Sequence, residues 1–329
     1  MSTIFAAMRD RLLVVTGRPG GWRVRTRLSE HDLECVAAPG DEPDRVLVGT
    51  FDDGLYRSTD GGMTFNRVGD WMPKSVTALA VSTTDSDVWW AGTEPSRVFR
   101  STDGGRSWME RPGLGDLDSA EEWSFPPRPH THHVRWIEPD ATEVGRLYVG
   151  IEAGALVRTD DGGETWQDRP EDGRRDNHSL ATHPDRPTAV WAAAGDGYAE
   201  SEDGGDTWQF PQTGLDHRYC WSVAVDPGDS DTVVMSAASG ARSAHSMPGE
   251  SYVYRRDGDG PWVRIDDDEL PTGDGVLRAV LATDGPGEFY AVTNRGLFMS
   301  LDGGESWSAL DVDWPEALTE MTPRGLAVV

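Results

Sequence analysis

The stretch Ser101-Thr-Asp-Gly-Gly-Arg-Ser-Trp108 decides the fold, because copies of it recur along nearly the whole chain. The shared pattern is Ser/Thr-x-Asp-x-Gly-x-Ser/Thr followed by Trp or Phe. Full copies occupy residues 58–65, 101–108, 159–166, 201–208 and 300–307, and a weaker copy at 255–262 keeps Asp257 and Trp262. A repeat that returns along the chain predicts one array of similar units rather than two unrelated domains.

Short apolar runs between the copies have the length of β-strands. In one unit they cover residues 76–81, 88–91, 98–100 and 107–110, without helical periodicity. Four short strands per unit are typical of one blade of a β-propeller. We therefore predict an all-β, seven-bladed β-propeller that forms a single domain over residues 1–329. The aromatic residues that mark the seven blades are Trp22, Phe65, Trp108, Trp166, Trp208, Trp262 and Trp307.

The two ends of the chain predict how the ring closes. The first unit begins with strands at 3–8, 11–16 and 22–28, so it lacks an innermost strand, while residues 325–329 form one apolar strand without a unit of its own. An open ring would leave an unpaired strand edge. We therefore expect the C-terminal strand to complete the N-terminal blade.

The repeated aspartates have a structural explanation. Each can accept hydrogen bonds from the backbone of its own turn, while the glycines adopt positive φ and the aromatic residue packs beneath. The alternative, calcium binding, lacks enough oxygen ligands in every unit. We interpret these residues as fold-making: Asp60, Asp103, Asp161, Asp203, Asp257 and Asp302.

These turns resemble the Asp-boxes, or BNR repeats, of the sialidase-like superfamily of propellers, which is grouped with WD40- and YVTN-type repeat proteins. The resemblance covers essentially the whole chain and implies a seven-bladed propeller with the Asp-box turns on the face opposite the active site. Members include glycosidases, polysaccharide lyases, receptor ectodomains and photosystem assembly factors. The Arg-Ile-Pro motif, arginine triad and tyrosine–glutamate pair of true sialidases have no match here, so sialidase activity is not implied.

Composition limits the partners. The chain has 30 basic and 57 acidic residues and a formal net charge of −27. Nucleic acid and anionic membranes are therefore poor partners, because their charge is repelled over most of the surface. Lys74 is the only lysine and aspartate outnumbers glutamate, which is typical of a salt-rich cytoplasm but also of a GC-rich genome with an ordinary acidic surface.

Two further features bear on location. Cys35 and Cys220 fall in expected strands of different units, so we expect two buried thiols and no disulfide. Charged residues at 9–11 interrupt the apolar N-terminal segment, which therefore reads neither as a signal peptide nor as a membrane span. We expect a cytoplasmic protein.

Polar residues gather where the innermost strands begin, on the face opposite the repeated turns. Aligning the units gives equivalent first positions to Thr77, His133, His178, Trp221 and Arg278. The long connections at 112–132, 170–177, 212–219 and 239–251 open on the same face, as do the turns that follow the second strands. These segments add Glu121, Glu122, His130, His132, His217, Arg218, Tyr219, Arg242 and His245, together with Glu94, Glu152 and Asn294.

A mouth rich in histidine and arginine can transfer protons, hold a metal or bind an anion. We expect a hydrolase or lyase that acts on an anionic or saccharide-like small substrate. The expected catalytic residues are His133, His178, Tyr219 and Glu152. The expected ligand-binding residues are Arg218, Trp221, Arg242, His245, Arg278, His132 and Glu121. A divalent transition metal, if bound, is expected at His133, His178 and His245.

Two other interpretations stay open. The same face would suit a non-catalytic scaffold that binds a protein partner, although this explains the concentration of histidine less well. Alternatively, the segment 127–133 is an ordered loop whose histidines stack on Trp123 and Trp136 without a ligand.

Overall fold

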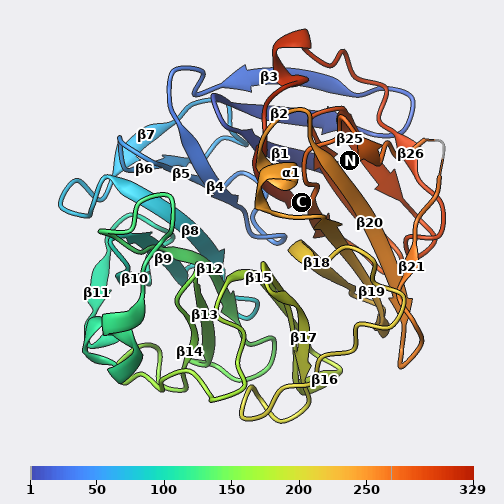
Figure 1. Cartoon of the computed structure of the whole chain (residues 1–329). Helices are drawn as coiled ribbons and strands as arrows, with labels where there is room; N and C mark the ends of the chain where they lie inside the picture. Colours follow the sequence, from blue (N-terminus) through green and yellow to red (C-terminus); the bar gives the residue numbers. More distant parts are fainter. Residues whose placement is uncertain (1, 268) are drawn as a thin grey trace.

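The computed structural model describes residues 2–267 and 269–329, and it contains seven antiparallel sheets around a central channel (Figure 1). In the described part of the chain the only α-helix is α1 (Ala241–His245), and three 3-10 helices are present: η1 (Leu114–Asp116), η2 (Asp118–Glu122) and η3 (Glu316–Leu318). Every described helix is too short to cross a membrane. The predicted all-β, seven-bladed propeller is confirmed.

Each blade runs outward from the channel. The innermost strands are β27 (Pro323–Val328), β4 (Leu33–Ala37), β8 (Ser75–Val81), β12 (Val134–Pro139), β15 (Asn177–His183), β18 (Tyr219–Asp226) and β23 (Val280–Thr283). The second strands are β1 (Ser2–Met8), β5 (Val46–Thr50), β9 (Trp89–Glu94), β13 (Leu147–Ile151), β16 (Arg186–Ala194), β19 (Asp229–Ala238) and β24 (Phe289–Thr293).

The third strands are β2 (Arg11–Gly17), β6 (Leu55–Ser58), β10 (Val98–Ser101), β14 (Ala155–Thr159), β17 (Gly197–Ser201), β20 (Glu250–Asp257) and β25 (Gly296–Ser300). The outer strands are β3 (Arg23–Arg27), β7 (Asn66–Val68), β11 (Met109–Arg111), β21 (Val263–Arg264) and β26 (Ser308–Ala309), and β22 (Gly273–Asp274) also pairs with β20. In the fourth and fifth blades a single bridge replaces the outer strand, at Arg158–Gln167 and at Glu200–Gln209.

The C-terminal strand closes the ring, as predicted. β27 pairs antiparallel with β1, from Val328 opposite Ile4 to Pro323 opposite Met8. Beyond the strand, Thr3 and Val329 exchange two backbone hydrogen bonds of 2.6 and 3.0 Å. The pairing removes the free edge of the N-terminal blade and joins the two ends of the chain in one sheet.

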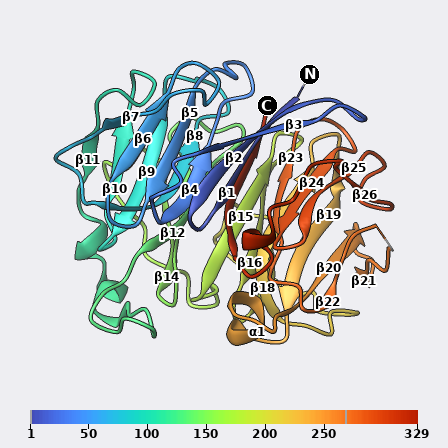
Figure 2. The same ribbon diagram turned by 90° about the horizontal axis from the view of Figure 1, so that it is seen from above.

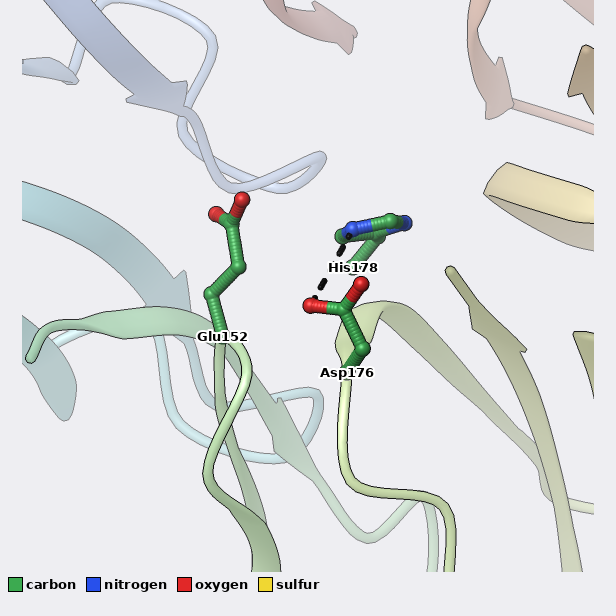
Figure 3. Close-up of side chains that lie close together, drawn as sticks. All are labelled: Glu152, Asp176 and His178. Carbon is green, nitrogen blue, oxygen red and sulfur yellow. Dashed lines mark ion pairs between the residues drawn. The ribbon is translucent and has the colours of Figure 1, made fainter. Parts of the chain in front are cut away.

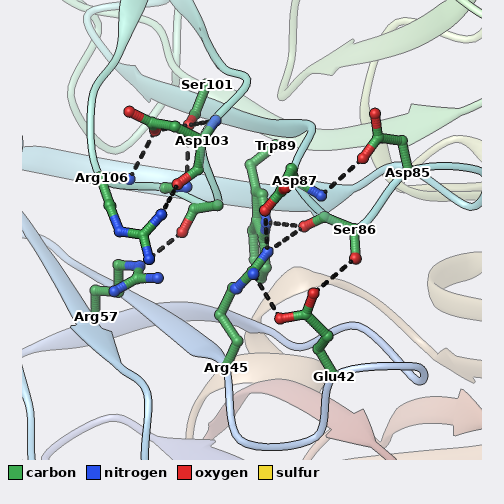
Figure 4. A network of polar contacts seen from close by, with 12 residues as sticks. Glu42, Arg45, Arg57, Asp85, Ser86, Asp87, Trp89, Ser101, Asp103 and Arg106 are labelled. Carbon is green, nitrogen blue, oxygen red and sulfur yellow. Dashed lines mark hydrogen bonds and ion pairs between the residues drawn. The ribbon is translucent and has the colours of Figure 1, made fainter.

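The repeated turns are held by their aspartates (Figure 4). Oδ1 of Asp103 accepts hydrogen bonds from the backbone N–H of Arg106 at 3.0 Å and of Ser107 at 2.8 Å, and from Ser101 Oγ at 2.8 Å. Ser107 Oγ donates to Oδ2 at 2.6 Å. The other four full copies make the corresponding bonds from the last Ser or Thr of the motif to their aspartates, at 60, 161, 203 and 302.

Asp257 does not make these hydrogen bonds, so the prediction that it holds its turn is wrong. Its side chain accepts from Arg255 and, at 3.3 Å, from Thr232 Oγ1. The turn is held instead by the N–H of Gly260, which donates to the backbone carbonyl of Asp257 at 2.9 Å. The weaker copy has lost the Ser/Thr residues that flank the aspartate, so the carboxylate turns outward to an arginine.

Arginines connect neighbouring blades at these turns. Arg57 Nε on β6 donates to the carbonyl of Gly104 in the next turn at 2.6 Å (Figure 4), and Arg255 on β20 makes the same bond to Gly303 at 2.7 Å. Arg158 on β14 bonds to Gly204 in the same way. The turns therefore stabilise the packing of blade on blade as well as each hairpin.

Candidate functional site

A β-bulge marks the start of six of the seven innermost strands. In each, one residue is skipped by the pairing with the second strand, and such bulges commonly redirect a side chain. The skipped residues are Arg324, Glu34, Thr77, Arg135, His178 and Trp221. Arg278 occupies the corresponding region of the seventh blade, just before β23. The alignment of the units by sequence predicted His133 at this level of the channel. In the structure, the residue at the bulge of β12 is Arg135.

A cavity of about 570 Å³ opens at this level of the channel. It lies beside α1, which sits over the centre of the ring in Figure 1 and at the end opposite both termini in Figure 2. Four aromatic rings on its walls come from three segments: Phe51, Phe125, and Tyr219 with Trp221 on β18. Its charged lining residues are Arg9, Arg128, Arg135, Arg242, Arg324, His133, His245, Asp32, Glu34, Glu152 and Asp176.

Glu152 follows β13 and is held ionised. His133 Nε2 lies 2.9 Å from Oε2 of Glu152, and Arg135 Nε lies 3.9 Å from the same oxygen. Burial opposes ionisation, but the hydrogen bond from His133 and the surrounding positive charge outweigh it and lower the pKa of Glu152. Glu152 therefore presents a carboxylate to the cavity over a wide pH range.

Asp176 and His178 face Glu152 from the start of β15 (Figure 3). His178 Nδ1 lies 2.6 Å from the carbonyl oxygen of Cys220, so this nitrogen carries the hydrogen and Nε2 has a free lone pair. Nε2 lies 3.6 Å from Oδ1 of Asp176. Burial raises the pKa of Asp176 and lowers that of His178. The pair therefore tends toward a protonated acid beside a neutral imidazole.

Tyr219 joins two histidines. Its hydroxyl lies 2.9 Å from Nε2 of His245 on α1 and 3.4 Å from Nε2 of His178. Burial and the acidic groups Glu152 and Asp176 raise the pKa of Tyr219, so the phenol stays protonated. Burial, reinforced by Arg278, lowers the pKa of His245 to about 2, so this ring is neutral.

Trp221 lies at the centre of the cluster. The imidazole of His178 lies 4.3 Å from the indole, measured between ring centroids, and that of His245 lies 4.6 Å away. Two guanidinium groups also lie over the indole, with Arg278 Cζ at 3.7 Å and Arg135 Cζ at 4.6 Å from the ring centroid. Arg278 is fully buried and lies outside the cavity lining.

The long insertion before β12 forms one wall of the mouth. Arg128 Nε and Nη2 donate to the two carboxylate oxygens of Glu94 at 3.0 and 2.6 Å. The same guanidinium lies over the rings of Phe51 and Phe125, and Phe125 packs edge-on against His133 at 4.8 Å. These contacts anchor the insertion across two blades and place Phe125 in the cavity.

Three residues expected in the site lie elsewhere. Glu121 is exposed on η2, and Arg218 is exposed, and both lie outside the cavity lining. His132 packs edge-on against Trp123 at 5.5 Å between ring centroids, a contact with Trp123 in place of the stacking expected for a loop without a ligand. The connections that carry these residues fold back over the blades. A residue that the sequence places next to the mouth can therefore direct its side chain away from it.

Two further expected residues have structural roles. His217 stacks on Tyr252 with 4.0 Å between ring centroids. Oδ1 of Asn294 accepts a hydrogen bond from the backbone N–H of Leu277 at 2.8 Å. Both side chains are therefore used to hold connections next to the mouth.

The residues whose donor atoms lie close enough to surround one metal ion differ from those expected. Among the described residues, the donors that could surround one ion are Glu152, Asp176 and His178, whose atoms lie within 4.8 Å of one another. His133 and His245 are instead paired with Glu152 and Tyr219. The guanidinium of Arg135 beside Glu152 disfavours a divalent cation here.

The sequence has recognisable relatives, although no family model matches it. It is 26% identical to the Photosystem II assembly lipoprotein Ycf48 of Synechococcus sp. (strain CC9902) over 287 residues, covering 84% of this chain and 76% of that protein. It is 27% identical to an oligoxyloglucan-reducing end-specific xyloglucanase of Emericella nidulans over 198 residues, covering 49% of this chain and 23% of the enzyme.

Solved structures show the same architecture. The Niastella koreensis GH74 enzyme superimposes with a TM-score of 0.67 at 15% identity, covering 92% of this chain and 54% of that enzyme. YCF48 bound to D1 peptide superimposes with a TM-score of 0.61 at 19% identity, covering 90% of this chain and 92% of that protein. The chain thus spans about half of the GH74 enzyme, and at these identities the likeness establishes the propeller fold alone.

Proposed function

We propose that the cavity is the active site of a hydrolase that acts on an anionic or saccharide-like small substrate, with Glu152 and Asp176 as its two carboxyl groups. One observation carries the proposal. The two side chains reach the cavity from neighbouring blades within 4.8 Å of each other, and their surroundings favour opposite protonation states. Two carboxyl groups with divergent pKa values are the usual equipment for hydrolysing a glycosidic bond.

The protonation state of each carboxyl group gives it its role in the reaction. Asp176 gives its proton to the leaving oxygen, while the carboxylate of Glu152 attacks the anomeric carbon. A water then cleaves the glycosyl ester and returns a proton to Asp176. The separation within 4.8 Å is closer to the spacing of about 5 to 5.5 Å in retaining enzymes than to about 6.5 to 9.5 Å in inverting ones.

His133 and Tyr219 are positioning residues in this scheme. His133 forms a hydrogen bond with Oε2 of Glu152, so Oε1 stays free to attack the anomeric carbon. Tyr219, held by His245, keeps its proton and can donate a hydrogen bond to substrate. Its raised pKa makes a phenolate base costly, which favours hydrolysis over the lyase alternative.

The cavity has the properties of a small-ligand site. Its volume of about 570 Å³ falls within the usual range of about 300 to 1,000 Å³ for such sites. The half-buried ring of Phe125, which lines the cavity, suits the apolar face of a sugar ring. Arg242, exposed on α1 at the rim, supplies positive charge for an anionic substituent.

A second candidate is a scaffold that binds a peptide segment across the same mouth. The observation that favours it is the 26% identity to the Ycf48 assembly lipoprotein over most of both chains. In this case Arg242 and the aromatic walls would bind a peptide, and the carboxyl pair would be incidental.

The test compares Glu152→Gln and Asp176→Asn with Glu121→Gln, which changes the same kind of side chain on exposed η2, outside the cavity. The purified proteins are incubated with neutral and acidic oligosaccharides, and released reducing ends are measured. We expect hydrolysis by the parent and by Glu121→Gln, and a loss of at least 100-fold in the other two. If the parent is inactive and a peptide array is bound through Arg242, the scaffold is correct.

A further inference from the structure

The guanidinium of Arg278 has no acceptor within the part of the chain that the structure describes. The residue is 0% exposed, and Nε, Nη1 and Nη2 are all buried without a hydrogen-bond partner. The guanidinium lies over the indole of Trp221, with 3.7 Å between Cζ and the ring centroid. Arginine does not lose its proton in proteins, so a full positive charge is buried here without a hydrogen-bond partner among the described residues.

Two more arginines lie beside it, from other blades. Arg324, the bulge residue of β27, and Arg135, the bulge residue of β12, are near enough that their positive charge, after burial, lowers the pKa of Arg278. The Nε atoms of Arg135 and Arg324 are themselves buried without a partner among the described residues. Three guanidinium groups from three blades therefore meet in the channel wall with unused donors.

The protein's own carboxylates do not balance this charge. The carboxylate oxygen paired with Arg135 is Glu152 Oε2 at 3.9 Å, and the one paired with Arg324 is Glu34 Oε2 at 3.5 Å. Glu152 already accepts from His133. Among the described residues, no carboxylate lies within salt-bridge distance of Arg278, so its single positive charge is left without a close counter-ion.

The surroundings also separate Arg278 from the cavity. Arg278 lies outside the cavity lining, with Trp221 next to it, whereas Arg135, Arg324 and Trp221 do line the cavity. A substrate in the cavity thus meets Arg135 and Arg324 but not Arg278. Water could accept from the N–H groups but would leave the charge unbalanced.

We propose that a small monovalent anion, with the charge and size of chloride, is bound at the Arg278 guanidinium within the channel wall, flanked by Arg135 and Arg324. The anion bridges blade 7, blade 4 and the closing strand β27. It is a structural component of the ring and does not rest on the proposed hydrolase activity. Because it binds the folded ring and not the unfolded chain, it raises the unfolding temperature in proportion to the logarithm of its concentration.

The experiment measures thermal unfolding without substrate, while sodium chloride replaces sodium methanesulfonate at constant ionic strength. We expect the unfolding temperature of the parent to rise by several degrees across the series. Arg278→Met should abolish this slope, and Arg218→Met, an exposed arginine outside the site, should keep it. Equal unfolding temperatures in chloride and methanesulfonate, or an unchanged slope in Arg278→Met, would overturn the proposal.

A second measurement is independent of how well Arg278→Met folds. Crystals of the parent grown in sodium bromide are used to locate bromide by its anomalous scattering. The proposal predicts a peak within hydrogen-bond distance of the Arg278 guanidinium. Bromide found only on the surface would overturn it. Neither readout involves catalysis, so a failed hydrolysis assay leaves this result unaffected.

Discussion

Asp176 Oδ1 lies 3.6 Å from His178 Nε2, and a single residue separates the two in the chain. Side chains two positions apart share a face of an extended strand, and the register shift between Asn177 and Ser179 turns His178 toward the channel. Across the gap stands Glu152 of the preceding blade. The bulge thus brings an acid, an imidazole and a carboxylate together at one level of the ring.

The repeated turns should differ in their contribution to stability. Asp103→Ala removes the acceptor of two backbone N–H groups and two hydroxyls, so we expect a loss of about 1 to 2 kcal/mol in the free energy of unfolding. Asp257→Ala removes only an outward contact with Arg255 and Thr232 and should cost much less. Urea unfolding measures both. Equal losses would contradict the separate role assigned to Asp257.

Ring closure should dominate the stability of the whole propeller. Deleting residues 325–329 removes most of the pairing between β27 and β1, a loss on the order of 5 kcal/mol if each ladder hydrogen bond contributes about 1 kcal/mol. Leu301→Ala, an exposed side chain at 60% accessibility, is the matched control and should change little. An unchanged urea midpoint after the deletion would show that the ring closes in another way.

Glu138 should make stability depend on pH near neutrality. Burial raises the pKa of Glu138 from 4.5 to about 7, against hydrogen bonds from Trp136 and Thr182. In this range the folded state holds a proton that the unfolded state has released. The free energy of unfolding therefore falls as pH rises from about 4.5 through 7 and then levels off.

Glu138→Gln should remove this part of the pH dependence and stabilise the protein most above pH 7. Glu143→Gln, an exposed glutamate nearby, serves as the control. Unfolding curves from pH 5 to 9 decide the matter: parallel profiles for the parent and Glu138→Gln would mean that Glu138 titrates normally.

Much of the fold could be predicted because the turn motif carries its own register. The spacing from Trp108 to Trp166 and onward counts the blades, and the apolar residues 325–329 need a partner that only the N-terminal blade lacks. The failure at Asp257 has a physical reason as well. Without the flanking Ser/Thr hydroxyls, an aspartate in such a turn no longer has its usual partners.

The grouping of residues around the cavity was predicted in part. Glu152, His178, Tyr219 and Trp221 do lie together, since they sit at the ends of inner or second strands whose position the repeat fixes. Arg135 was missed in favour of His133, because a β-bulge leaves no mark in one sequence. Asp176 is one of 57 acidic residues and has no distinguishing neighbour. Arg324 was hidden because the closing strand was not aligned with the other inner strands.

The most direct test of the hydrolase proposal separates the two carboxyl groups by the need for acid assistance. An aryl glycoside with a dinitrophenol leaving group departs without protonation, whereas an alkyl glycoside needs the proton of Asp176. The measurement is kcat/KM for both substrates in the parent, Asp176→Asn, Glu152→Gln and Glu121→Gln. We predict that Asp176→Asn loses at least 100-fold on the alkyl glycoside but little on the dinitrophenyl one, while Glu152→Gln loses both. Equal values in all four proteins, or no turnover of either substrate by the parent, would contradict the account.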